Sequence, residues 1–169
     1  DTGLALNGSD HCWLETSAHY PEVDSIGMFC LDKEIIINTN DNVFDNGQFS
    51  RLSNSHGPIE VAAIPWALHG PWPMSFENYT ENEKTKLSYE RYTKQQDTFV
   101  ETITTLKPNT VIPIGGGLVA GGPKALQYRY SGIKSKTDTV DYVHDRVPDT
   151  QLVLLPESGT YDSRTNKSS

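Results

Sequence analysis

The sequence predicts an α/β fold in which short strands alternate with helices around one core. Two observations carry this prediction: β-branched apolar runs recur along the chain, and a long helical pattern with start and stop signals separates two of them. The chain has 169 residues, of which 36% are hydrophobic, so it is long enough for one domain with a buried core. We place this domain at residues 1–157 and expect 158–169 to be a polar, frayed tail.

The amino-terminal part of the chain is predicted to form strands. Apolar runs at 12–15 and 26–31 are short enough for strands, and a third run resumes at 34–38 after a two-residue polar turn. Two such runs separated by two polar residues indicate a β-hairpin. The isoleucine triplet at 35–37 predicts a strand that is buried on both faces.

A polar break and a short helix follow this strand. Five polar residues at 38–42 end it, and a helix is expected over 43–52. The inward side chains of this helix are expected to be Phe44, Phe49 and Leu52. Gly57 and Pro58 stop the helix, and 59–64 is the next buried strand.

The clearest element is a long helix over 82–106. Thr80 and Glu83 have the spacing of a capping box, in which each side chain satisfies a free amide at the helix start. Pro108 ends the helix. Apolar and aromatic residues at near-helical spacing predict its buried face: Leu87, Tyr92, Phe99, Ile103 and Leu106.

The last predicted elements surround a glycine triplet. Residues 110–114 form a buried strand that closes into glycines at 115–117, and a helix over 123–130 and a strand over 151–155 follow. The triplet is interpreted as a tight loop, and a backbone cradle for an anion is the alternative.

Composition excludes several classes of partner. A net charge of −8 argues against binding to nucleic acid or to an anionic membrane surface, because both need clustered cations. No apolar run approaches the roughly 18–20 residues that span a bilayer, and no secretory signal is visible. Cys12 and Cys30 are expected to be buried reduced thiols, with a disulfide as the alternative. We therefore expect a cytoplasmic protein.

Five short motifs occur in an order that is typical of one known fold. They are Asp24-Ser25 with Ile-Asn-Thr-Asn-Asp at 37–41, Gly-Pro-Trp-Pro at 70–73, a charged helix from Glu81, Leu-Lys-Pro-Asn-Thr-Val-Ile-Pro at 106–113, and Val-Leu-Leu-Pro-Glu at 153–157. In this order they resemble the metallo-β-lactamase fold, in the branch of the sialic-acid hydroxylase-like and ascorbate-phosphate-lactonase-like families. The resemblance implies half of an αββα sandwich, with one mixed sheet flanked by helices.

The resemblance has a functional implication and a gap. Intact relatives use a metal-bound hydroxide to attack an ester, lactone, amide or phosphodiester. The histidine-rich signature of the fold, H-x-H-x-D-H, does not occur here, since the five histidines are scattered singly. The resemblance therefore implies a metal-dependent hydrolase with a small-molecule substrate, incomplete or inactive as this chain. The alternative is a non-catalytic, metal-free dimerisation or binding module. The sheet face that a second layer would cover would then pair with itself or with a partner, and we expect a homodimer.

The resemblance also implies site residues. Asp41 falls at the position of a metal-bridging carboxylate, and His19 lies near that of a histidine ligand. These ligand types suit zinc, with iron or manganese as alternatives, and a chain without metal is the other possibility. An ordinary turn residue and an exposed loop histidine are the alternative interpretations.

The loop before the long helix and the glycine triplet complete the predicted site. His69, beside Trp66 and Trp72, is expected to bind substrate or act as an acid/base, against a histidine that stacks between aromatic rings without a role. Gly115 stands where the family usually has its final histidine ligand, and glycine cannot bind a metal through a side chain. The resemblance therefore does not imply a complete two-metal centre.

Overall fold

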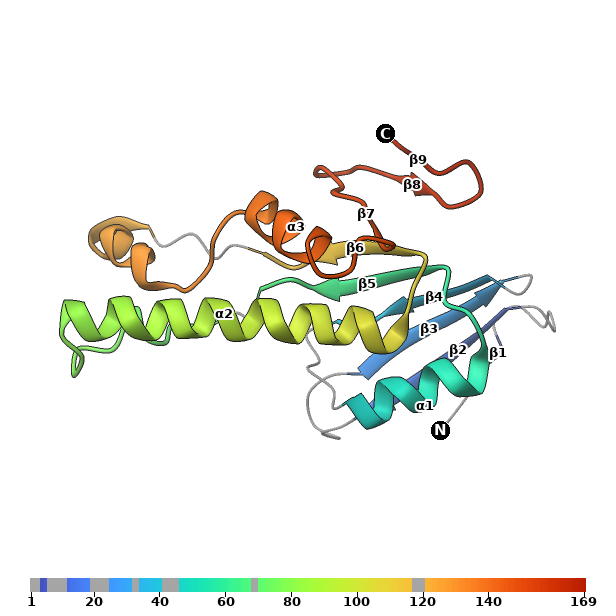
Figure 1. Ribbon diagram of the computed structural model, residues 1–169, viewed down its shortest axis with the longest axis horizontal. Coiled ribbons are helices and arrows are strands. Elements are labelled where there is room, and N and C mark those ends of the chain that lie inside the picture. The colour runs from blue at the N-terminus through green and yellow to red at the C-terminus, as the bar shows by residue number, and fades with distance from the viewer. Residues whose placement is uncertain are drawn as a thin grey trace.

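The fold is a mixed sheet with helices packed against it, which confirms the predicted α/β class (Figure 1). A computed structural model describes residues 4–5, 12–18, 25–31, 34–40, 46–67, 70–116 and 121–169. Within these residues seven strands follow one another across the sheet in sequence order, from β1 to β7. A separate two-stranded sheet, β8–β9, lies at the carboxyl end of the chain.

The sheet changes from antiparallel to parallel pairing at β4. The antiparallel half consists of β1 (Leu4–Ala5), β2 (Cys12–Ala18), β3 (Ser25–Leu31) and β4 (Glu34–Asn38). The parallel half continues from β4 into β5 (Val61–Pro65), β6 (Thr110–Ile114) and β7 (Gln151–Leu152). The predicted hairpin of β3 and β4 is confirmed, and the isoleucine strand β4 lies in the same mixed sheet as β6.

Each parallel pair of strands is joined by a crossover that contains a helix. The crossovers contain α1 (Asn46–His56), α2 (Glu81–Leu106), and the 3₁₀-helix η1 (Gly122–Tyr130) with α3 (Lys136–His144). The predicted long helix is confirmed to within one residue at its start, and its capping box between Thr80 and Glu83 is present. At about 1.5 Å per residue α2 is about 39 Å long, and its amino-terminal half extends beyond the sheet (Figure 1).

The three described α-helices cover the same face of the sheet. Phe49 of α1, Ile103 of α2 and Val143 of α3 belong to one buried cluster together with Ile37 of β4. Ile36, whose side chain points to the other face, is 37% exposed. The prediction that this strand is buried on both faces was therefore wrong, because the helices pack against one face only.

The opposite face of the sheet is apolar and partly open. Phe29 of β3 pairs directly with Ile36 of β4, and Phe29 is 40% exposed. We call this the open face and define it by these two residues. Apolar side chains on an exposed sheet face are a feature that needs a structural or functional reason.

The carboxyl-terminal segment is a hairpin, and it packs against the sheet where the parallel strands begin. It consists of β8 (Tyr161–Asp162) and β9 (Lys167–Ser168). The Tyr161 hydroxyl lies 3.0 Å from Thr110 Oγ1 at the start of β6, and Gln151 Nε2 donates to Asn166 Oδ1 at 2.7 Å. Part of the expected frayed tail at 158–169 therefore forms a hairpin, which side-chain hydrogen bonds join to the sheet.

No helix in the described part of the chain is both long and apolar enough to cross a membrane.

Candidate functional site

The parallel strands β4, β5 and β6 end at one edge of the sheet. Parallel neighbours have their carboxyl ends on the same side, and in open α/β sheets ligands bind outside this edge. The residues that follow the three strands are Thr39 after β4, Trp66 after β5 and Gly115 after β6. A ligand site is therefore expected at this carboxyl edge of the sheet.

The end of β4 is tied to β5 by a threonine. Thr39 is fully buried, and both its backbone N–H and its hydroxyl donate to the Ala63 carbonyl, at 3.0 and 3.3 Å. Asn40 then takes a left-handed conformation with φ 51°, and its N–H donates to Asn38 Oδ1 at 2.9 Å. The polar break predicted after this strand therefore ends it through local side-chain hydrogen bonds.

The ends of β5 and β6 are joined by a tryptophan. The buried Trp66 donates its backbone N–H to the Ile114 carbonyl at 3.2 Å and its indole Nε1–H to the Gly115 carbonyl at 3.0 Å. Gly116 has φ +139°, and a Cβ built there would lie 3.0 Å from Trp66 Nε1. The two described glycines fit the predicted tight loop, because the indole approaches the backbone closely.

The three predicted site residues, His19, Asp41 and His69, lie outside the described residues. Within the described ranges, no group of three or more histidine, cysteine, aspartate or glutamate side chains converges in a way that could hold a metal ion.

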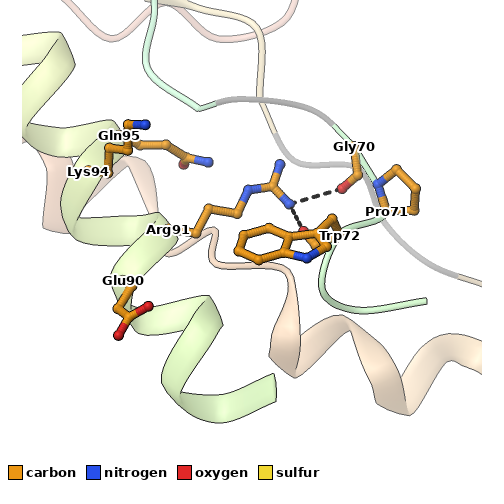
Figure 2. Close-up of a pocket in the computed structure, with 7 residues that line it drawn as sticks. All are labelled: Gly70, Pro71, Trp72, Glu90, Arg91, Lys94 and Gln95. Atoms are coloured by element: carbon orange, nitrogen blue, oxygen red, sulfur yellow. Dashed lines mark hydrogen bonds between the residues drawn. The ribbon is translucent and has the colours of Figure 1, made fainter. Parts of the chain in front are cut away.

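The loop that follows residue 69 is held on α2 by two cationic side chains. Lys84 is buried and donates to the Met74 carbonyl at 3.2 Å. Arg91 donates to the Gly70 carbonyl at 3.1 Å and also to the Trp72 carbonyl (Figure 2). Because cations bind the carbonyls of this loop, its position depends on charged hydrogen bonds as well as on apolar contact.

A pocket of about 470 Å³ lies between this loop and α2. We call it the Trp72 pocket. Figure 2 shows its seven lining residues, which are Gly70, Pro71 and Trp72 from the loop and Glu90, Arg91, Lys94 and Gln95 from α2. The volume falls in the range of about 300–1,000 Å³ that is typical of small-molecule sites.

The electrostatics of the pocket come from α2. Partial burial lowers the pKa of the Arg91 guanidinium, but an arginine remains charged at any physiological pH. Lys94 adds a second cation near the solvent, and Glu90 contributes one carboxylate, which also lies 3.8 Å from Lys86 Nζ. The pocket therefore has one positive charge more than it has negative charges.

The buried face of α2 differs from the predicted one in its amino-terminal half. Leu87 and Tyr92 are only half-buried, whereas Lys84, Ser88 and Gln95 are buried. One sequence pattern does indicate this face: residues that recur every three or four positions, polar in the first half of the helix and mainly apolar in the second. They are Lys84, Ser88, Arg91, Gln95, Phe99, Thr102 and Leu106. The apolar pattern did not predict this face, because the residues buried in its amino-terminal half are polar, and polar side chains are mostly exposed in proteins.

Comparison with known proteins adds no family assignment. The sequence matches no model of a known protein family, and a search of curated proteins finds no match to it. The fold and the site geometry are therefore the basis for a functional proposal.

Proposed function

We propose that this chain forms one sheet layer of a metal-dependent hydrolase of the metallo-β-lactamase type. A divalent metal, zinc first and iron or manganese as alternatives, would supply a bound hydroxide that attacks a small ester, lactone, amide or phosphodiester. Asp41 and His19 are the proposed ligands, and His69 is the proposed substrate-binding or acid/base residue. The free thiol of Cys30 agrees with a cytoplasmic location, which we include in the proposal.

The observation that carries the proposal is the arrangement of the strands that precede two of these residues. In the sequence, Asp41 follows the end of β4 and His69 follows the end of β5. The two strands are parallel neighbours, so both segments leave the sheet at the same edge. The one-sided helix cover gives a second support, since half of an αββα sandwich leaves one sheet face for another layer.

Metal analysis tests this proposal on the purified protein. The chain is loaded with zinc, iron(II) or manganese, dialysed and analysed for bound metal. We expect one of the metals to remain and to be lost on Asp41→Ala. Asp149→Ala is the matched control, because Asp149 is an exposed carboxylate in the turn before β7, and this variant should keep the metal. Absence of bound metal after loading, or equal loss in both variants, contradicts the proposal.

A second candidate function has its own support on the open face. Phe29 and Ile36 form an exposed cross-strand pair, and monomeric proteins rarely leave contiguous apolar surface uncovered. This favours a metal-free module in which two copies pack through their sheets. Such an interface would be isologous, with Phe29 and Ile36 of each copy facing the same region of the other.

Sedimentation analysis tests this second function. We expect the unaltered chain of 18.8 kDa to sediment as a dimer and the double variant Phe29→Ser with Ile36→Thr to sediment as a monomer. Leu126→Ser is the control, because Leu126 is 82% exposed on η1, away from the open face. A monomeric unaltered chain, or dissociation by the control substitution, contradicts dimerisation through this face.

A further inference from the structure

The Trp72 pocket has the features of a binding site that needs no metal. Its two walls are held together, because Arg91 of α2 donates to the carbonyls of Gly70 and Trp72 in the loop (Figure 2). A site whose walls are fixed before binding loses less conformational entropy when a ligand enters. The pocket is therefore largely preformed.

The loop wall presents a flat apolar surface. Trp72 is 36% exposed, and the exposed Pro71 ring precedes it in the loop. An indole face binds another aromatic ring by offset stacking, and such a pair adds to the effect of area burial. This wall favours a planar aromatic ligand.

The helix wall contains an unsatisfied hydrogen-bond donor. Gln95 is 4% exposed and lines the pocket, and its Nε2 has no hydrogen-bond partner among the described residues. A buried N–H without an acceptor destabilises the folded state, so the amide gains from a reorientation that gives each of its two ends a partner.

The amide of Gln95 can adapt to a ligand with little rearrangement. In Figure 2 its end points toward the Arg91 guanidinium. The two ends of an amide are nearly isosteric, so a half-turn about its last torsion turns the oxygen toward the guanidinium and presents the NH₂ group to the pocket. Gln95 would then donate to an acceptor in the pocket.

The charges around the pocket select the type of acceptor. Arg91 and Lys94 line it against the single carboxylate of Glu90, whereas the chain as a whole has a net charge of −8. A local excess of positive charge on an acidic protein favours an anionic group. A carboxylate is also an acceptor that can accept from Gln95 and interact with Lys94 at the same time.

We propose that the Trp72 pocket binds a small aromatic carboxylate, with its ring stacked on Trp72 and its carboxylate held by Gln95 and Lys94. This site does not depend on the proposed hydrolase function, and binding at it requires no metal.

Calorimetric titration with 2-naphthoate tests the proposal, with 2-naphthamide and 2-naphthylmethylammonium as neutral and cationic probes of the same ring. We expect saturable binding of one 2-naphthoate per chain, and affinity roughly tenfold lower for the amide because a charged hydrogen bond is lost. Equal or tighter binding of either comparison probe overturns the assignment of a carboxylate. No saturable binding of 2-naphthoate overturns the site.

Two substitutions with a matched control locate the binding. Gln95→Leu should weaken 2-naphthoate roughly tenfold, and Lys94→Gln, at an exposed position where folding is unaffected, roughly threefold. Gln96→Leu is the control, because Gln96 is the next residue on α2, is equally buried and has an unpartnered Oε1, but does not line the pocket. If Gln96→Leu weakens binding as much as Gln95→Leu, or Lys94→Gln has no effect, the proposed contacts are wrong.

Discussion

The indole Nε1–H of Trp66 donates to the Gly115 carbonyl at 3.0 Å and so joins the carboxyl ends of β5 and β6. The bond crosses 49 positions of sequence, and α2 lies between its two ends. Gly116 lies against the same indole, where a Cβ would come within 3.0 Å of Nε1. The tryptophan therefore holds the edge of the sheet at which we place the candidate site.

Replacement of this tryptophan should destabilise the fold. Trp66→Phe removes the hydrogen bond and leaves unfilled volume in the core, and we expect the free energy of unfolding to fall by about 1–3 kcal/mol. Urea unfolding followed by circular dichroism measures it. Trp72→Phe is the control, because Trp72 is partly exposed, and its change should stay within about 0.5 kcal/mol. Similar losses in both variants would show that the Trp66 bond contributes nothing specific.

Substitution of Gly132 tests the close contact that the segment after η1 makes with α2. A Cβ at this glycine, which has φ +70°, would lie 2.8 Å from the Ser88 carbonyl oxygen. Gly132→Ala should destabilise by about 2–4 kcal/mol, from left-handed strain together with steric overlap. Gly122→Ala is matched in backbone conformation, with φ +66°, but has no atom within 4 Å of the added Cβ. Its loss should be about 1–2 kcal/mol, and equal losses would exclude the steric contribution.

The start of α2 depends on the reciprocal hydrogen bonds of its capping box. The Glu83 N–H donates to Thr80 Oγ1 at 3.3 Å, and the Thr80 N–H donates to Glu83 Oε2 at 2.8 Å. Thr80→Ala should reduce the free energy of unfolding by about 1 kcal/mol. Thr85→Ala is the control one turn further along the helix, because the Thr85 hydroxyl donates to Glu81 O inside the helix and takes no part in the cap. A larger effect at Thr85 than at Thr80 would contradict the capping role.

Stability should fall as the pH falls through the carboxylate range. Hydrogen bonds from the Thr80 backbone and side chain lower the pKa of Glu83, and those from Ser135 lower the pKa of Asp138. A carboxylate with a lowered pKa stabilises the folded state above its unfolded pKa, and this contribution is lost as the pH falls through the folded pKa, below about pH 4.5.

The contribution of one carboxylate to this acid sensitivity can be isolated. Glu83→Gln should flatten the dependence of stability on pH between about pH 5 and pH 2. In the Thr80→Ala background the same substitution should still change it, but less, because the side-chain hydrogen bond to Glu83 is absent while the stronger contribution of the backbone N–H of residue 80 remains. Urea unfolding across this range measures both. An identical effect of Glu83→Gln in the two backgrounds would contradict the assignment.

A capping box in the sequence marks the start of α2, which was predicted, and also the start of α3, which was not. The long helix was predicted because its capping box involves residues three apart. The start of α3 has the same kind of signal, with Ser135 and Asp138 joined by reciprocal hydrogen bonds. This helix was nevertheless overlooked, because its sequence has few apolar residues to mark a buried face.

The sequence by itself determined the α/β class, the order of the strands along the chain and the start of the long helix. These follow from apolar spacing, glycine and proline positions and capping residues, all of which act over a few positions. The tertiary structure alone decided that Ile36 is exposed, that Lys84 and Gln95 are buried, and that Trp72 meets α2 to form a pocket. Burial depends on which distant segments pack against a residue, and no local pattern specifies those neighbours.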